Sequence, residues 1–161
     1  MQVEVSDPQV RFRELHERRD PLYRAVALAV GDVWVAAEAI DEAMTRAYQR
    51  WDRVSRYDNP EGWVYRVAVN WSRSALRKRR NEVLQGDLPE TGSVDHSSDF
   101  ELRDAMERLP VKFRVVVVAR YLLDWSTEET AAALRVPVGT VKSRLKRGLD
   151  RLAVDLVGEE L

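Results

Sequence analysis

The sequence contains no cysteine among its 161 residues and only two histidines, His16 and His96. Without cysteine the chain can form neither disulfide bonds nor thiolate metal sites. The two histidines are far apart, and neither has a neighbour at the spacing of a metal site or a catalytic triad, so we interpret both as surface residues. The sequence therefore predicts no metal site, no cofactor and no catalytic residues.

Long apolar runs are absent as well. No stretch of about 18 apolar residues occurs, which argues against a membrane-spanning helix. Residues 1–11 lack the basic start and apolar stretch of a secretion signal. A hydrophobic share of 45% and a charged share of 33% are typical of a helix-rich globular protein. We therefore expect a cytoplasmic protein with no membrane insertion.

The net charge is only −1, but the charges are unevenly distributed. Residues 63–80 contain six basic residues and no acid, and residues 137–152 contain five basic residues and one acid. Between them, residues 81–110 contain eight acids and two bases. Two basic blocks separated by an acidic one predict two positive faces on a nearly neutral protein, a pattern that fits nucleic-acid binding.

Residues 81–99 are rich in Gly, Pro, Ser, Thr, Asp and Asn and contain few apolar residues, which predicts a flexible acidic linker. Apolar residues on both sides of this linker recur at helical spacing. We therefore expect an all-α protein, with two small helical domains over residues 8–80 and 100–157 joined by the linker 81–99.

In the first domain, apolar residues at helical spacing precede a break at Gly31-Asp32, and residues 36–51 form an amphipathic pattern. Residues 55–60 are a turn signal, and Pro60 suits the start of a helix. The helix that follows carries apolar residues from 63 to 76 and is expected to end in the bases at 77–80.

The second domain begins with a helical pattern that stops before Pro110. Residues 115–118 are four consecutive valines, and β-branched residues of this kind favour a strand. Apolar residues nevertheless continue to residue 123, and no partner strand is evident nearby. We therefore expect a helix here.

Residues 126–152 predict a helix-turn-helix. Ser126 and Glu129 form a capping box that opens a short helix over 127–134, Ala131 provides a small residue for close helix contact, and residues 135–137 form the turn. In the next helix an apolar face lies opposite a polar and basic one, made of Lys142, Ser143, Lys146 and Arg147. A basic face alone is typical of any solvated amphipathic helix, but the capped helix and turn before it favour major-groove recognition.

Residues 109–152 closely resemble region 4 of the extracytoplasmic-function (ECF) sigma factors, in the opening LPVKFR and in the string PVGTVKSRL. LuxR-type regulators share the general helix-turn-helix but rarely this string. Residues 36–51 resemble region 2.2 of the same family, and residues 63–80 resemble regions 2.3 and 2.4. The resemblance implies a sigma factor that directs core RNA polymerase to specific promoters and helps to open and hold the minus-10 region.

The sequence departs from the family at two places. The usual Asp-Leu-Val-Gln-Glu of region 2.2 reads Glu-Ala-Ile-Asp-Glu at residues 38–42, so Asp41 replaces glutamine. Thr130 stands where region 4 usually has isoleucine, and we expect its methyl group to pack at some loss of buried apolar area.

The resemblance also implies roles for individual residues. The helix-turn-helix residues would read the duplex minus-35 element, and the loop 56–62 with the helix after it would hold the melted minus-10 strand. Trp63 and Trp71 could stack on bases, but their spacing places them on one helical face and favours burial of both. The candidates for minus-10 contact are Asn70 as base reader, Arg66, Arg73 and Arg77 as phosphate track, and Tyr57 and Asn59 in the loop.

Glu38, Asp41 and Glu42 form an acidic helix face, for which solubility alone would be a sufficient explanation. The resemblance implies instead that this face docks on the β′ clamp helices of RNA polymerase, that region 4 contacts the β flap, and that an anti-sigma factor is a further expected partner. The acidic linker would thread towards the active-site cleft, although a simple solvated tether fits its composition equally well.

Two other functions are compatible with parts of the sequence. A DNA-binding regulator could use the helix-turn-helix without binding polymerase, but its N-terminal half would have no reason to carry residues 63–80. A helical enzyme is disfavoured because the carboxylates lie on charged helix faces without a histidine, cysteine or phosphate-binding loop nearby.

Overall fold

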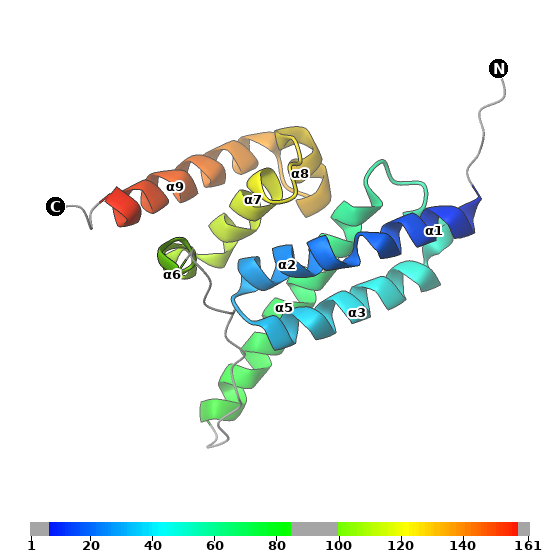
Figure 1. Ribbon diagram of the computed structural model, residues 1–161, viewed down its shortest axis with the longest axis horizontal. Helices are drawn as coiled ribbons and strands as arrows, with labels where there is room; N and C mark the ends of the chain where they lie inside the picture. The colour runs from blue at the N-terminus through cyan, green and yellow to red at the C-terminus, as the bar shows by residue number, and fades with distance from the viewer. Residues whose placement is uncertain (1–6, 85–99, 158–161) are drawn as a thin grey trace.

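The computed structural model describes residues 7–84 and 100–157, and within these two ranges every regular element is an α-helix. The N-terminal domain and the C-terminal domain form two bundles that lie side by side (Figure 1). No helix in the described part of the chain is long and apolar enough to cross a membrane. The helices are α1 (Pro8–Glu17), α2 (Arg19–Val30), α3 (Val33–Gln49), α4 (Trp51–Val54), α5 (Pro60–Leu84), α6 (Phe100–Arg108), α7 (Val111–Tyr121), α8 (Thr127–Leu134) and α9 (Val138–Val157).

The predicted break at Gly31-Asp32 is confirmed. Gly31 ends α2 in the left-handed conformation with a φ of 80°, which glycine adopts without steric cost. The Asp32 carboxylate then caps α3, accepting hydrogen bonds from the backbone nitrogens of Trp34 and Val35 at 3.0 and 3.1 Å. Asp32 is buried and also pairs with Arg79 of α5 at 3.4 Å, so one carboxylate joins the start of α3 to the second half of α5.

The N-terminal domain differs from expectation at three helix boundaries. Helix α1 was not predicted, and it is held by the Trp51 indole, whose Nε1 donates to the Pro8 carbonyl at 2.6 Å. The helix expected over 36–51 ends at Gln49, and Trp51 starts the short α4. Helix α5 begins at Pro60 as predicted but continues past Arg80 to Leu84, because no glycine or proline interrupts the chain before Gly86. Residues 85–99, the rest of the predicted linker, lie outside the described residues.

The valine run at 115–118 is helical, as expected against its local propensity. It lies in α7, and all four valines are buried. Helix α7 packs on α2 of the N-terminal domain and on α8 and α9 of its own domain, so apolar side chains are buried around most of its circumference. Packing on several sides outweighs the strand preference of valine, because burial contributes more than intrinsic propensity.

The helix-turn-helix has the predicted boundaries. Ser126 Oγ accepts from the backbone nitrogen of Glu129 at 3.0 Å, and the Glu129 carboxylate accepts from the Ser126 nitrogen at 3.2 Å, which completes the capping box. Arg135 ends α8 in the left-handed conformation. Ala131 is buried beside Val116 and Val141, so a small residue lies at the helix crossing as expected.

Thr130 is fully buried, and its Oγ1 has no hydrogen-bond partner in the described part of the chain. We predict that Thr130→Val, which keeps the shape and removes the unpaired hydroxyl, raises the free energy of unfolding by about 1 kcal/mol. Urea denaturation measures the change. Thr45→Val, at an exposed position of α3, is the control and should stay within about 0.5 kcal/mol of the parent; a destabilised Thr130→Val protein would contradict the prediction.

Candidate nucleic-acid interface

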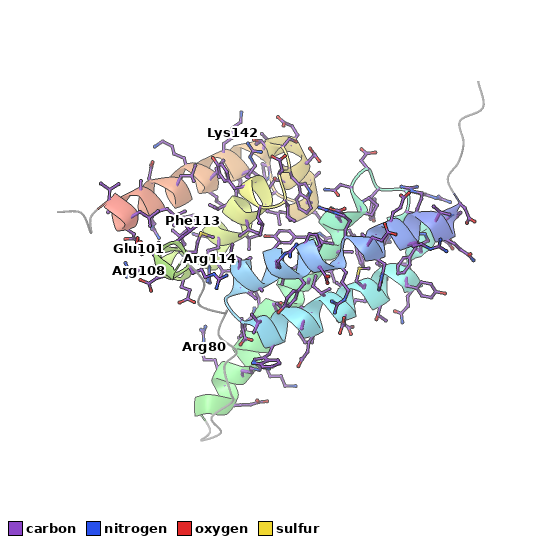
Figure 2. The ribbon with its side chains drawn as sticks, viewed as in Figure 1. Arg80, Glu101, Arg108, Phe113, Arg114 and Lys142 are labelled. Carbon is purple, nitrogen blue, oxygen red and sulfur yellow. The ribbon has the colours of Figure 1, made fainter. Side chains whose placement is uncertain are left out.

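The predicted face of α9 is exposed. Lys142, Ser143, Lys146 and Arg147 are all solvent-accessible, while Val141 and Leu152 on the opposite side are buried. Figure 2 shows Lys142 on the side of α9 turned away from the N-terminal domain. Among the described residues, Lys146 pairs with Asp150 at 2.9 Å, whereas Lys142 and Arg147 have no ion pair. The second helix of the motif therefore presents cationic donors to solvent.

A close helix crossing sets the position of α9. Gly148 is buried, and a Cβ atom at this position would lie 3.0 Å from Cγ2 of Val117 on α7. The absence of a side chain thus lets α9 approach α7 closely. Arg151 follows on the same helix, with its guanidinium 5.1 Å from the ring centroid of Phe113. Sequence reasoning did not single out Gly148, because a lone glycine in a helix gives no information about the neighbour it faces.

A second cationic face runs along α5. Arg66 is half-buried, and the other members of the face are exposed. Their spacings of four and three residues place them on one side of the helix over roughly 21 Å. The face comprises four residues predicted from the sequence, Arg66, Asn70, Arg73 and Arg77, together with Arg80, which sequence reasoning did not include. Figure 2 labels Arg80 on the second half of α5. Arg79 does not belong to it, because it pairs with Asp32.

The loop before α5 borders a cleft of about 440 Å³ between the two domains. Asn59 accepts a hydrogen bond from the Gly62 nitrogen at 3.3 Å, and its Nδ2 is buried without a partner in the described residues. Burial lowers the pKa of the Arg66 guanidinium, and the nearby charge of Arg135 lowers it further. The cleft is lined by Tyr57, Asp58, Asn59, Trp63 and Arg66 on one wall and by Glu128, Glu129, Ala132, Ala133 and Arg135 on the other.

The two tryptophans of α5 pack into the protein. Trp63 is buried, and Trp71 is half-buried against the core. The structure therefore favours the interpretation that they stabilise the fold. Tyr65, which sequence reasoning missed, is fully buried on another side of the helix.

The acidic residues of α3 differ in their surroundings. Glu38 and Asp41 are exposed, and Asp41 contacts Arg19 at 2.5 Å. Glu42 is half-buried and pairs with Arg46 of the same helix at 2.9 Å. Glu38 and Asp41 belong to an exposed stripe with Trp34, Thr45 and Tyr48, again at spacings of four and three residues. Trp34 and Tyr48 are 62% and 69% exposed, and sequence reasoning missed both as surface residues.

Within the described ranges, no group of three or more side chains has the composition of a metal site. His16 is exposed, as expected for a surface residue, and His96 lies outside the described residues.

Residues 15–82 match the family described as Sigma-70 region 2, and residues 99–152 match Sigma-70, region 4. The RNA polymerase sigma-E factor of Streptomyces coelicolor is 37% identical over 158 residues, which cover 94% of this chain and 89% of that protein. The chain belongs to the ECF sigma factors of the sigma-70 family. As a sigma factor it is a regulatory initiation factor that directs RNA polymerase to specific promoters.

Two further similarities extend over both domains of this sigma factor. The ECF RNA polymerase sigma factor SigW of Bacillus subtilis is 29% identical over 157 residues, covering 86% of this chain and 84% of SigW. The solved structure of the sigma factor RpoE in complex with the anti-sigma factor NepR from Bartonella quintana has a TM-score of 0.77 at 22% identity, covering 89% of this chain and 94% of RpoE. The structural likeness shows a shared two-domain helical fold. The N-terminal and C-terminal domains are hereafter called the region 2 and region 4 domains.

Proposed function

We propose that the two cationic faces divide promoter recognition between them, with α9 of the region 4 domain reading duplex minus-35 DNA and α5 of the region 2 domain holding the melted minus-10 strand. The observation that carries this proposal is the position of the faces. They lie on different domains, on exposed sides of long helices whose opposite sides are buried. A single DNA-binding surface would not require two such faces.

The chemistry of α9 suits duplex recognition. An α-helix fits the major groove, and its lysine and arginine side chains can donate to guanine edges or to phosphate oxygens. Lys142 and Arg147 are the strongest candidates, because Lys146 is already paired with Asp150.

The chemistry of α5 suits an opened strand. Single-stranded DNA is held by a cationic track along its backbone and by a pocket for an unstacked base. Arg66, Arg73, Arg77 and Arg80 supply the track, and Asn70, in its middle, can form a bidentate amide pair with a base. Tyr57 and Asn59 border the cleft into which an unstacked base would turn.

The exposed stripe of α3 fits a protein partner. Its aromatic ends and acidic centre suit a basic helical surface, and we assign it to the β′ clamp helices of core polymerase. We further propose that region 4 contacts the β flap, that the protein acts in the cytoplasm without catalytic activity of its own, and that an anti-sigma factor regulates it, as the RpoE–NepR complex illustrates for a relative.

Run-off transcription with purified core polymerase on a promoter library tests the whole proposal. Promoter-dependent transcripts sharing a minus-35 and a minus-10 sequence are expected when this chain is added. Their absence with active core enzyme would refute it.

We predict that Arg147→Ala weakens binding to a duplex carrying the minus-35 sequence. A lost base contact should cost about 1–3 kcal/mol and relax specificity at one position, whereas a lost phosphate contact should reduce the slope of log K against log salt by about 0.9. Fluorescence anisotropy at several salt concentrations separates the two cases. Arg13→Ala, at an exposed position of α1, is the control; equal affinity of the two variants would exclude Arg147 from the interface.

We predict that the double variant Arg73→Ala, Arg77→Ala slows open-complex formation by the holoenzyme by at least about tenfold, since each lost charge contact with the strand contributes on the order of 1 kcal/mol. Permanganate reactivity of minus-10 thymines follows strand opening. Lys78→Ala is a matched control, because Lys78 is exposed on α5 but lies beside the cationic face. An equal effect of the control variant would argue against a specific track.

We predict that Glu38→Lys combined with Asp41→Lys lowers the affinity for core polymerase at least about tenfold, because like charges then face the basic clamp helices. Binding of the same variant to minus-35 duplex should be unchanged, which excludes general misfolding. Glu17→Lys on α1 is the control. Undiminished core binding by the double variant would remove α3 from the polymerase interface.

A further inference from the structure

The second half of α5 has little apolar anchorage. Ser72 is buried, but none of residues 73–82 is. Only Ala75, Leu76 and Arg79 are half-buried there, and Figure 1 shows this end of α5 projecting past the bundle formed by α2 and α3. Residues 73–82 are hereafter called the distal segment. Because apolar burial is the main source of helix stability in a protein, packing alone holds this segment weakly.

Charge repulsion works against the distal segment as well. Residues 73–80 contain five basic residues and no acid. Three of them, Arg73, Arg77 and Arg80, follow one another at spacings of four and three residues, and like charges at such spacings destabilise a helix. The same three belong to the cationic face to which we assign the minus-10 strand. The segment that presents this face therefore needs support from outside the helix.

One carboxylate supplies that support. Asp32, at the turn between α2 and α3, accepts a hydrogen bond on Oδ2 from Nη1 of Arg79 at 3.4 Å. Within the described ranges, this is the only side-chain hydrogen bond or salt bridge between the distal segment and the chain outside α5. At roughly 100° per residue, Arg79 is about 160° around the helix from Arg77, so the bond lies on the side away from the cationic face. It therefore fixes the position of the segment and also the direction of the face.

The negative charge of Asp32 is explained by Arg79 and not by the helix cap. Oδ1 of the same carboxylate accepts from the backbone nitrogens of Trp34 and Val35 at 3.0 and 3.1 Å, but asparagine caps helices about as well as aspartate. Asp32 is only 4% exposed, and burial of a charge is costly unless the charge is paired. Among the described residues, Arg79 is the cation that pairs with it. A charged residue at this buried cap is thus required by the bond to α5.

We propose that Asp32 is a positioning residue for minus-10 recognition, because its bond to Arg79 holds the distal segment against the bundle and so orients the cationic face. The inference rests on the proposed function in one respect, the assignment of α5 to the minus-10 strand. Asp32 is buried and acts through the helix that carries the DNA contacts, without touching the strand itself. Without the bond, the distal segment frays and the strand loses part of its ordered track.

The variant Asp32→Asn separates the bond from the cap. The asparagine side-chain oxygen can still cap α3, whereas its amide group is a donor and cannot accept from Arg79. The substitution also removes a negative charge and frees a cation, which by electrostatics alone would strengthen binding to DNA. A loss of affinity for the strand is therefore opposite to the electrostatic expectation and indicates positioning.

Three further variants complete the test. Asp7→Asn is the matched control, because Asp7 caps α1 by accepting from the Gln9 nitrogen at 3.0 Å and has no ion pair in the part of the chain that the structure describes. Arg79→Gln removes the bond from the other side. Arg79→Lys should restore it, since a single contact, unlike a bidentate one, does not require a guanidinium.

Two kinds of readout separate positioning from a general loss of stability. Because the chain has no cysteine, a nitroxide label can be attached at Lys78→Cys in the distal segment or at Thr45→Cys on α3, both exposed, and its mobility in the free protein followed by electron paramagnetic resonance. With the holoenzyme, affinity is measured for a single-stranded oligonucleotide that carries the minus-10 non-template sequence selected in run-off transcription. Affinities for core polymerase and for minus-35 duplex are measured in parallel.

We expect Asp32→Asn and Arg79→Gln to mobilise the label at residue 78 but not the label at residue 45. Strand affinity should fall about fivefold if the ordered fraction of the distal segment falls to about a fifth. Arg79→Lys and Asp7→Asn should keep the mobility and the strand affinity of the parent. All variants should bind core polymerase and minus-35 duplex as the parent does.

The proposal is overturned if Asp32→Asn leaves the label at residue 78 as immobile as in the parent. It is also overturned if Asp32→Asn mobilises this label without a loss of strand affinity while the Arg73→Ala, Arg77→Ala holoenzyme is slowed in promoter opening. An equal loss of strand affinity in Asp7→Asn would contradict it as well. Unaltered promoter opening by the Arg73→Ala, Arg77→Ala holoenzyme would instead refute the assignment of α5, and the positioning role with it.

Discussion

The first half of α5 is apolar on almost every side, and the fold depends on burying it from two directions. Val64 and Ala68 belong to the core of region 2, while Tyr65 is covered by Trp125 and Val115 of region 4. Each large side chain removed from water in this way contributes about 1.5–3 kcal/mol. The second domain completes the burial of this helix. The helix that carries the candidate minus-10 residues is therefore also the helix through which the domains meet.

The candidate binding surfaces are what remains exposed after this burial. On α3 and α5 the side opposite the core carries a stripe whose members are spaced three and four residues apart, and on α9 two adjacent pairs, Lys142-Ser143 and Lys146-Arg147, recur after four residues. The stripe is acidic between two aromatic residues on α3 and cationic on α5 and α9, so one structural principle produces both the face proposed to bind protein and the two faces proposed to bind DNA. Because the stripes lie on separate helices, the net charge of −1 conceals two strongly positive regions. Charge distribution, and not total charge, determines the partners of this protein.

Local signals in the sequence predicted the elements whose stability is local. Gly31 and Asp32, Pro60, and the box of Ser126 and Glu129 marked helix boundaries correctly, because each acts on the backbone within a few residues. The helix at 115–118 was predicted only by setting propensity aside, and α1 was missed because Trp51 and Tyr48, which contact it, lie far along the chain. For the candidate binding residues, helical periodicity predicted which side of each helix is exposed. Periodicity did not predict the ion-pair partners of these residues, such as Asp150 for Lys146 or Arg46 for Glu42.

The sequence by itself determined that the protein is helical, that it carries a helix-turn-helix, and where its charges lie along each helix, since these features follow from backbone geometry over a few turns. The sequence also indicates a second contact for α5, because the apolar residues among 63–69 occupy more than one face of the helix. Only the tertiary structure decided which surface covers Tyr65, why residue 62 is glycine, and that α8 lies against the start of α5. Periodicity shows that a face must be buried, but the identity of the covering surface depends on the matching shapes of segments some 50 to 70 residues apart, which no local pattern encodes.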